Sequence, residues 1–380
     1  MKVLHLITWL NPGGIERWII NMLEAIPRTD CEMDVCCQGF SRGKWAEHAE
    51  DLGAKVLLNP LTPDHVVFGI RLARILSQGG YNILHVHLGA YSGFPAWIGH
   101  RMDVKVITTL HCVNFPAERW FLKIPVMEWL RSVYAKWSIK YAVRESDFIV
   151  GVSQGTLDEF IANVDKFSSK SCVIPHGVNM STSKPIQSRN LFLSKLDWLN
   201  DSPLIIHVGR FSAQKNHHGV LNVFKKVNDN LSKTRLVLVG EGALRPEIEQ
   251  MAQELSLDDK IAFLGFRDDV AEIMGFCDLM LMPSLFEGFG IAAIEAAAAG
   301  LPVVGSRVAG LVEAVEDGRT GLLFEPHDCD GMAGAIVRLL LDNDFAKKMG
   351  EAGRQRVRKL FSIGKMADQY LSLYRLCLNQ

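Results

Sequence analysis

The second half of the chain opens with Pro203-Leu204-Ile205-Ile206-His207-Val208, a short aliphatic run that ends directly before Gly209 and Arg210. Runs of this kind are typical of buried parallel strands when longer helical patterns separate them. Similar runs follow at 235–239, 261–264, 279–282, 302–304 and 321–324. The sequence therefore predicts a doubly wound parallel sheet in this half of the chain.

The first half repeats the same alternation of short apolar runs and helical patterns. Its predicted strands lie near 2–8, 33–38, 55–58, 82–87, 104–110 and 148–152. A chain of 380 residues is too long for one ordinary core and suits two domains. We therefore predict an α/β protein with two tandem Rossmann-like, doubly wound parallel-sheet domains that face a cleft. Ligands of such sheets bind beyond the carboxyl ends of the strands, so we expect the chemistry in those loops.

A polar segment at 181–189 is the best candidate for the linker between the two domains. We place an N-terminal domain at 1–185 and a C-terminal domain at 186–360. The stretch after Phe361 has helical spacing, and we expect a last helix at about 361–380. The residues available for one face of this helix are Met366, Tyr370, Leu373, Tyr374 and Cys377.

Composition narrows the class of protein. The 41 basic and 42 acidic residues nearly balance, which argues against nucleic acid as the main partner. Eight cysteines show neither zinc-ligand spacing nor a disulfide framework, as expected of free thiols in a reducing compartment. The N-terminal residues begin a strand without signal-peptide features, and no apolar run approaches the length that spans a bilayer. We expect a cytoplasmic protein.

Two cations follow the first strand of the second half. Arg210 offers a planar fork of donors and Lys215 a point charge, and together they suit the oxygens of a diphosphate. The alternative is a solvated pair on the surface.

The segment at 284–302 carries the strongest signal in the sequence. Gly288 and Gly290 bring the bare N-terminus of a predicted helix to a ligand, and unpaired N–H groups with the helix dipole favour phosphate there. Gly300 and the proline two residues later mark the end of that helix. Glu287 in the loop and Glu295 in the helix are suited to accept hydrogen bonds from hydroxyl groups. Glu295 as an ordinary helix-surface residue is the alternative.

Two features of the first half are weaker. Gly13 and Gly14 precede a helical pattern and allow the backbone to approach an anion, although a plain tight turn fits equally well. His111 ends a predicted strand, where its imidazole could bind a reacting sugar or serve only as a structural histidine.

At these residues the sequence resembles family 4 of the retaining GT-B glycosyltransferases, also called group 1, of the bacterial polysaccharide-biosynthesis type. The family motif E-x7-E matches Glu287 to Glu295, and V-G-R-x5-K matches Val208 to Lys215. Residues 237–242, 174–179 and 305–310 also match, so the resemblance covers nearly the whole chain. Cys112 and Asn179 depart from the residues that are common in the family.

The resemblance implies a role for each candidate residue. Arg210 and Lys215 would neutralise the diphosphate, while Glu287 would contact the donor sugar and Glu295 the ribose. The other residues implied in donor binding are Gly13, Gly14, Gly288, Phe289, Gly290 and Ile291. Of these, the backbone of Phe289 to Ile291 would meet the donor phosphate and sugar, and Gly14 would close over the phosphate from the other domain. His111 would contact the transferred sugar, and the last helix would cross back onto the N-terminal domain.

The expected activity is retaining, metal-independent transfer of a sugar from a nucleotide diphosphate sugar, with no cofactor. The acceptor expected from the resemblance is a glycan or a lipid-linked glycan in surface polysaccharide synthesis. Two D-x-D strings, Asp328 to Asp330 and Asp342 to Asp344, fit helix N-caps better than metal ligands. The alternatives are a GT-B enzyme of other chemistry, such as an epimerase or a glucan synthase, and a catalytically silent partner subunit.

Residues 118–144 interleave aromatic and basic side chains. One interpretation is a helix that rests on an anionic membrane surface, which would place the protein peripherally on the inner face of the membrane. The other is an aromatic core contact with a solvated basic face.

Overall fold

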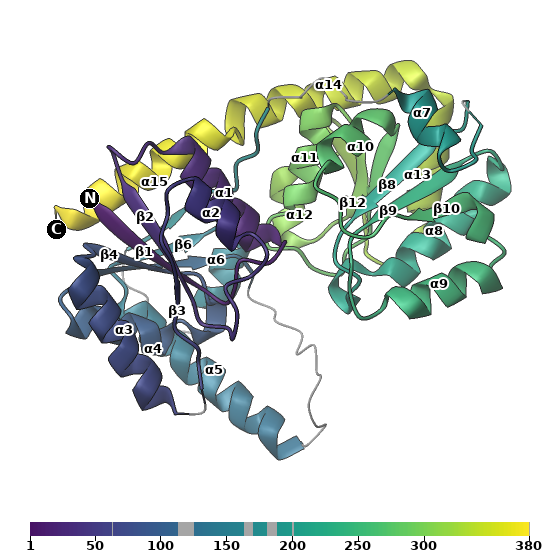
Figure 1. Ribbon diagram of the computed structural model, residues 1–380. Coiled ribbons are helices and arrows are strands. Elements are labelled where there is room, and N and C mark those ends of the chain that lie inside the picture. Colours follow the sequence, from purple (N-terminus) through teal and green to yellow (C-terminus); the bar gives the residue numbers. More distant parts are fainter. Residues whose placement is uncertain (63, 113–124, 163–169, 181–187, 200, 380) are drawn as a thin grey trace. The chain divides into compact units, whose positions relative to one another are not determined.

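The computed structural model describes residues 1–62, 64–112, 125–162, 170–180, 188–199 and 201–379, with the side chains of 125–132 excepted. The chain forms two compact units (Figure 1). Unit 1 comprises Met1–Gly177 and Ile363–Gln380, and unit 2 comprises Val178–Ser362.

The described residues of unit 1 form a seven-stranded parallel sheet in the order β3-β2-β1-β4-β5-β6-β7. Its strands are β1 (Lys2–Ile7), β2 (Glu32–Cys37), β3 (Val56–Leu58), β4 (Ile83–Val86), β5 (Lys105–Leu110), β6 (Phe148–Gly151) and β7 (Ser171–Val173). Strand β1 lies between β2 and β4, so the chain grows outward from it in both directions. The carboxyl ends of β1 and β4 therefore form the topological switch point of this sheet.

Helices cover both faces of the unit 1 sheet. They are α1 (Gly14–Ala25), α2 (Ala46–Asp51), α3 (His65–Gly79), α4 (Gly93–Arg101), α5 (Pro125–Glu145), α6 (Gln154–Ile161) and α15 (Ile363–Leu378), with a 3-10 turn η1 (Gly89–Tyr91). Side chains alternate across strand β1. Val3 and Ile7 pack in the core beneath α1 and α15, whereas Leu4 and Leu6 pack in the core beneath α3 and α4.

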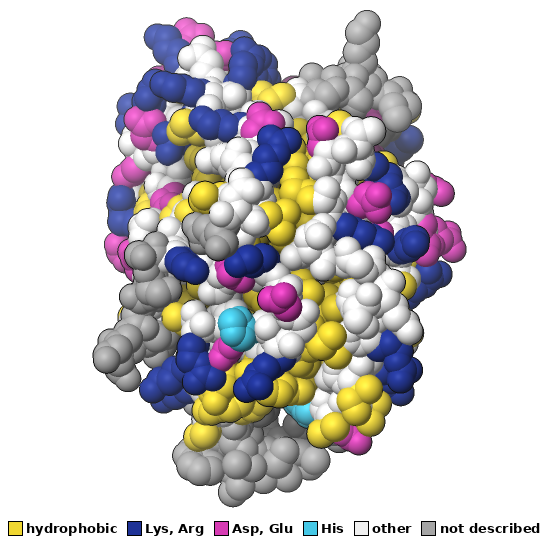
Figure 2. Space-filling view, turned by 90° about the vertical axis from the view of Figure 1, so that its left-hand side faces the viewer, with side chains coloured by type: hydrophobic (Ala, Val, Ile, Leu, Met, Phe, Trp, Pro, Cys, Tyr) yellow, Lys and Arg dark blue, Asp and Glu magenta, His cyan; other side chains and the backbone are white. Residues whose placement is uncertain are grey.

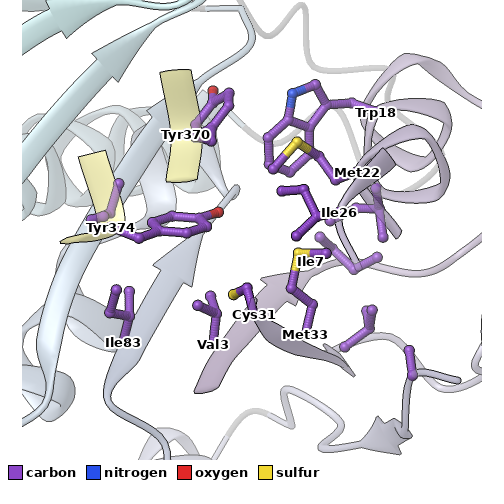
Figure 3. Packing of buried hydrophobic residues seen from close by; sticks show 14 of the residues in the cluster. Val3, Ile7, Trp18, Met22, Ile26, Cys31, Met33, Ile83, Tyr370 and Tyr374 are labelled. Atoms are coloured by element: carbon purple, nitrogen blue, oxygen red, sulfur yellow. The ribbon is translucent and has the colours of Figure 1, made fainter. Parts of the chain in front are cut away.

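The last helix completes the first of these cores. Tyr370 and Tyr374 of α15 face Val3, Ile83 and the Trp18 side chain of α1 (Figure 3). All five residues predicted for the apolar face of this helix are buried, which confirms the prediction. The C-terminal helix thus belongs to the fold of unit 1 although unit 2 precedes it in sequence.

Unit 2 has a six-stranded parallel sheet in its described residues, in the order β10-β9-β8-β11-β12-β13. Its strands are β8 (Leu204–Val208), β9 (Arg235–Val239), β10 (Ile261–Phe263), β11 (Leu279–Met282), β12 (Val303–Ser306) and β13 (Gly321–Phe324). Its helices are α7 (Arg189–Ser194), α8 (His217–Asn230), α9 (Arg245–Glu254), α10 (Val270–Phe276), α11 (Ile291–Ala299), α12 (Ala309–Ala314), α13 (Cys329–Leu341) and α14 (Asn343–Leu360), with 3-10 turns η2 (Ala213–Lys215) and η3 (Asp258–Lys260). The switch point of this sheet lies between β8 and β11.

The predicted pair of doubly wound parallel sheets is confirmed, and each predicted strand occurs within two residues of its expected bounds. Strand β7 was not predicted because it is only three residues long and begins with a polar serine at the edge of the sheet. The chain leaves unit 1 at Gly177 and returns to it at Ile363. The first crossing lies ahead of the predicted boundary at 185, and most of the predicted linker, 181–187, lies outside the described residues.

Candidate active site

The predicted phosphate-binding residues of unit 2 lie at its switch point. Strand β8 pairs with β11 in parallel, with Ile205 opposite Leu279. The loops that follow these two strands therefore leave the same edge of the sheet side by side. One loop carries Arg210 and Lys215, and the other carries Glu287 and leads into α11.

An ion pair joins the two loops. Lys215 Nζ donates to Glu287 Oε1 at 2.6 Å, and the two side chains are only 17% and 6% exposed. Two further hydrogen bonds, both from or to Gln214, hold the loops together beside this pair. Gln214 Nε2 donates to the Phe286 carbonyl at 3.1 Å, and the Leu285 N–H donates to the Gln214 carbonyl at 2.9 Å. A lysine ammonium and a carboxylate are thus fixed at the carboxyl edge of the sheet.

Arg210 lies at the same edge but is exposed. Within the part of the chain that the structure describes, its guanidinium makes no ion pair and no side-chain hydrogen bond. Its five N–H donors therefore face solvent, where an anionic ligand could approach them.

The start of α11 has the backbone geometry of an anion site. Gly290 has φ 90° and ψ 57°, a left-handed conformation that favours glycine, and it brings no side chain to cap the helix. The loop before it is packed tightly, because a Cβ on Gly310 would lie 2.4 Å from the Gly288 carbonyl. The Gly310 N–H donates to the Glu287 carbonyl at 3.2 Å. Helix α12 therefore holds this loop in place.

The remaining predicted residues of this segment take different positions. Phe289 is buried, and its ring packs edge to face on Phe361 with the ring centroids 5.2 Å apart. Ile291 is the first residue of α11, and Glu295 is half-buried one turn later. Gly300 ends the helix in the left-handed conformation, as predicted.

The two D-x-D strings are helix N-caps, as predicted. Asp328 accepts a hydrogen bond from the Gly331 N–H at 2.8 Å at the start of α13. Asp342 accepts one from the Phe345 N–H at 3.0 Å at the start of α14. Both carboxylates therefore have a structural use.

Two of the predicted residues of unit 1 lie at the start of helix α1, and the same helix carries Trp18 beside the third, His111. Gly13 is extended and precedes the helix, which begins at Gly14. One turn later Trp18 is buried, with its ring centroid 5.9 Å from that of His111. His111 itself directly follows β5.

His111 is part of a row of four hydrogen-bonded imidazoles. His5 Nδ1 lies 3.0 Å from His87 Nε2, and His87 Nδ1 lies 2.9 Å from His111 Nε2. His111 Nδ1 lies 3.4 Å from His176 Nε2. We call these four residues the histidine row. It begins on β1 and continues through residues that follow β4, β5 and β7, so it runs along the carboxyl edge of the sheet from the switch point.

The histidine row is neutral. Burial lowers the pKa of His5 and of His176 to about 3. Burial also lowers the pKa values of His87 and His111 well below the usual range, and neighbouring imidazoles lower them further. His111 is therefore suited to a neutral hydrogen-bonding role rather than to that of a charged acid.

Sequence reasoning singled out His111 alone from this row. His85 and His87 alternate at the end of a predicted strand, and His5 lies in the first predicted strand. An H-x-H pattern at a strand end is the signal that could have found His87. The link to His5 depends on the pairing of β1 with β4, which the sequence does not state.

Comparisons with known proteins identify the family. Residues 12–182 match the family described as Glycosyltransferase Family 4, and residues 188–356 match Glycosyl transferases group 1. The chain belongs to the group 1 glycosyltransferases. Together the two matches cover most of the chain, and each of the two units of this glycosyltransferase contains most of one match.

Curated relatives of this group 1 glycosyltransferase include two bacterial enzymes. It is 28% identical to N-acetyl-alpha-D-glucosaminyl L-malate synthase of Bacillus anthracis over 317 residues. These aligned residues cover 82% of this chain and 79% of the relative. It is 24% identical to UDP-Gal:alpha-D-GlcNAc-diphosphoundecaprenol alpha-1,3-galactosyltransferase of Escherichia coli over 98% of this chain and 96% of the relative. The protein is thus a transferase enzyme.

A solved structure shares the fold. Anabaena HepE, crystallised with UDP and glucose, superposes with a TM-score of 0.83 at 20% identity over 99% of each chain. The predicted GT-B fold of this glycosyltransferase is confirmed.

Proposed function

We propose that the protein is a retaining, metal-independent glycosyltransferase that transfers a sugar from a nucleotide diphosphate sugar to a lipid-linked glycan in surface polysaccharide synthesis. The observation that carries the proposal is the Lys215–Glu287 pair at the switch point of unit 2, beside Arg210 and the start of α11. Cations and unpaired N–H groups at the carboxyl edge of a doubly wound sheet are suited to a diphosphate.

The main task of the site is to stabilise the charge of the leaving nucleotide diphosphate. Lys215 and Arg210 supply two positive charges, and Glu287 holds the ammonium of Lys215 in position. Preorganised donors in such sites each contribute about 3 to 4 kcal/mol to the transition state. Two cations and a helix N-terminus can therefore carry the charge that a metal ion carries in other glycosyltransferases.

The proposed mechanism passes through an oxocarbenium-like state with attack on the same face of the sugar. The bond between the anomeric carbon and the diphosphate oxygen breaks, and the bond to the acceptor oxygen forms. The departing diphosphate takes the proton of the acceptor hydroxyl. Because Glu287 is paired with Lys215, it is better suited to binding the donor sugar than to acting as a free general base. In this proposal Glu295 binds the ribose, and His111 contacts the transferred sugar.

The lipid-linked acceptor is supported by a relative and by a surface. The name of the E. coli relative specifies a diphosphoundecaprenol-linked acceptor. On α5 of this chain, Trp137 is 47% exposed and packs against Tyr141 with the ring centroids 4.0 Å apart, and the Arg144 guanidinium lies 4.3 Å from the centre of the Tyr141 ring. Aromatic and basic side chains together suit a membrane interface. The aromatic and basic residues at 118–124 lie outside the described residues, and the side chains of 125–132 are not described.

Contact with a membrane would be peripheral in this proposal. No helix in the described residues has both the length and the apolar character that crossing a bilayer requires. On the face shown in Figure 2, lysine and arginine side chains are interspersed with acidic and hydrophobic ones. Co-sedimentation with vesicles of anionic phospholipid at low salt tests this contact. We expect the wild type to bind and a Trp137→Ala, Arg144→Ala variant to bind less; no binding by the wild type would exclude it.

A thermal-shift screen over nucleotide diphosphates and nucleotide sugars tests the donor site. A ligand at a hundred times its dissociation constant stabilises a protein by about 2.7 kcal/mol. Product analysis then separates the activities: a new glycosidic bond with a free nucleotide diphosphate supports transfer, whereas an isomerised donor would indicate an epimerase. A long homopolymer would indicate a glucan synthase. Donor binding without any product would indicate a silent subunit.

A further inference from the structure

We propose that His5 and His87 are positioning residues that hold His111 as the neutral Nδ1–H tautomer. In this tautomer the Nδ1–H group of His111 can donate a hydrogen bond to an oxygen atom of the substrate. The inference rests on the proposed function for its catalytic consequence. Its structural part stands on the histidine row alone.

The first two steps of the row fit the spacing of the sheet that carries it. Successive ring centroids are 5.3, 5.2 and 5.3 Å apart. Neighbouring strands lie about 4.8 Å apart, which is close to the span of one imidazole and one hydrogen bond. His5 on β1, His87 after β4 and His111 after β5 can therefore bond in series, because β1, β4 and β5 are neighbouring strands, whereas His176 follows β7, two strands from β5. The backbone N–H of His87 also donates to the Leu6 carbonyl at 2.9 Å, and this bond fixes the backbone of His87.

A row of neutral imidazoles has only two possible proton orders. Each ring carries one N–H and one bare nitrogen, so every bond in the row must point the same way. In one order, His5 Nδ1–H donates to His87, His87 Nδ1–H donates to His111, and His111 Nδ1–H donates to His176. In the other order, every bond is reversed.

The inner end of the row selects the first order. His5 Nε2 is buried, and it has no hydrogen-bond partner among the described residues. In the reversed order this atom would be a buried N–H without an acceptor, which proteins rarely tolerate. In the first order it is a bare nitrogen, a less costly group to bury. His111 is then protonated on Nδ1 and accepts the His87 proton on Nε2.

The two bonds of His111 are unequal. The bond from His87 is 2.9 Å long, a usual hydrogen-bond length, whereas the contact with His176 is 3.4 Å, near the limit for a hydrogen bond. The short bond orients the ring, and the long one can give way to a ligand oxygen. The ring of Trp18, 4.8 Å from His87 and 5.7 Å from His5, excludes water and so strengthens the bonds of the row.

Nuclear magnetic resonance of protein carrying ¹⁵N-labelled histidine tests the tautomer directly, because protonated and bare ring nitrogens resonate far apart. The His111 signals are assigned by their absence from a His111→Gln variant. We expect Nδ1 of His111 to be protonated and Nε2 to be bare in the wild type. The reverse assignment would overturn the proposal, whether or not the enzyme transfers sugar.

Matched variants then test the positioning role. His87→Leu removes the donor to His111, and we expect it to abolish the tautomer signature and to lower kcat about tenfold with little change in the donor KM. His87→Asn retains an N–H near the Nδ1 position. It should restore most of the tautomer signature and most of kcat. The control is His85→Leu: His85 is equally buried and packs on His87 at 4.1 Å, but its hydrogen bonds go to Tyr374 and Thr109. It should lower thermal stability yet leave the signature intact.

The outcomes separate the two proposals. A His85→Leu variant that loses the signature as completely as His87→Leu would reduce the role of His87 to packing. A wild type that binds no nucleotide and forms no product would contradict the proposed function, while the spectrum would still determine the proton order of the row.

Discussion

The Nζ atom of Lys215 lies 2.6 Å from Oε1 of Glu287, and these two largely buried side chains come from loops that follow neighbouring strands. Removing the lysine takes away a cation from the proposed diphosphate site and leaves a carboxylate without its partner. We expect Lys215→Ala to lower turnover about a hundredfold. Initial rates of nucleotide diphosphate release with saturating donor measure this directly.

The matched control is a second lysine of unit 2. Lys226 also pairs with a carboxylate, that of Asp330, at 2.6 Å, but both side chains are exposed to solvent. Exposed ion pairs of this kind contribute little to the free energy of folding. Because Lys226 is not part of the proposed diphosphate site, Lys226→Ala should change turnover by less than about twofold. If Lys215→Ala kept activity within threefold of the wild type, Lys215 would have no place in the mechanism.

Gly310 offers a test of the loop that carries Glu287. A Cβ there would lie 2.4 Å from the Gly288 carbonyl, so Gly310→Ala must displace the loop before α11. We expect the donor KM to rise about tenfold, because small displacements of a binding group are costly. Steady-state kinetics and nucleotide thermal shifts measure the effect.

Gly334 is the control for that substitution. It lies within α13, and a Cβ there would meet no atom within 4 Å. Gly334→Ala should stabilise the protein by about 0.5 to 1 kcal/mol and leave the donor KM unchanged. Equal kinetics in the two variants would show that the packing of α12 on the loop does not matter for donor binding.

Much of the fold follows from local sequence. The aliphatic runs predict the strands because a strand buried on both faces must be apolar throughout, and Gly300 predicts the end of α11 because the last turn needs a left-handed residue. Strand β7 escapes such reasoning because Ser171-Cys172-Val173 is short and only half-buried. Its place depends on pairing with β6 rather than on its own composition.

Local sequence likewise predicts part of the candidate site but not all of it. Arg210, Lys215 and Glu287 are recognisable because each lies just after a predicted strand. The contact between Lys215 and Glu287 is not, because it depends on β8 lying next to β11. The histidine row depends likewise on the order of β1, β4 and β5. Sequence therefore predicted the residues, and the order of strands decides which of them meet.

The D-x-D strings lead to a prediction on metals. Asp328 caps α13, so Asp328→Ala should lower the free energy of unfolding by about 1 kcal/mol without changing turnover. In the proposed mechanism Arg210 and Lys215 carry the charge of the leaving group. We therefore expect full transfer activity after exhaustive chelation with EDTA. If chelation abolished the activity, manganese restored it, and the Asp328→Ala or Asp342→Ala variant could not be restored in this way, these carboxylates would be reassigned to metal binding.

The buried histidines predict that unit 1 is sensitive to acid. Burial lowers the pKa of His5 and His176 to about 3 and lowers those of His85, His87 and His111 well below the usual range. In the unfolded chain these imidazoles titrate near pH 6.5. Between pH 6.5 and about 3 the unfolded state therefore binds more protons than the folded state, so stability is complete above pH 6.5 and falls as the pH is lowered.

Each imidazole that stays neutral in the folded state contributes a loss of about 1.4 kcal/mol for each pH unit below 6.5. Because several such residues share one sheet edge, we expect the urea midpoint of unit 1, followed by the fluorescence of buried Trp18, to fall steeply between pH 7 and pH 5. His5→Leu removes one of the titrating groups and should flatten this dependence, whereas replacing the exposed His48 should leave it unchanged. A midpoint that does not move over this range would mean that the imidazoles of the row gain protons as readily in the folded protein as in the unfolded chain, and that burial does not keep them neutral.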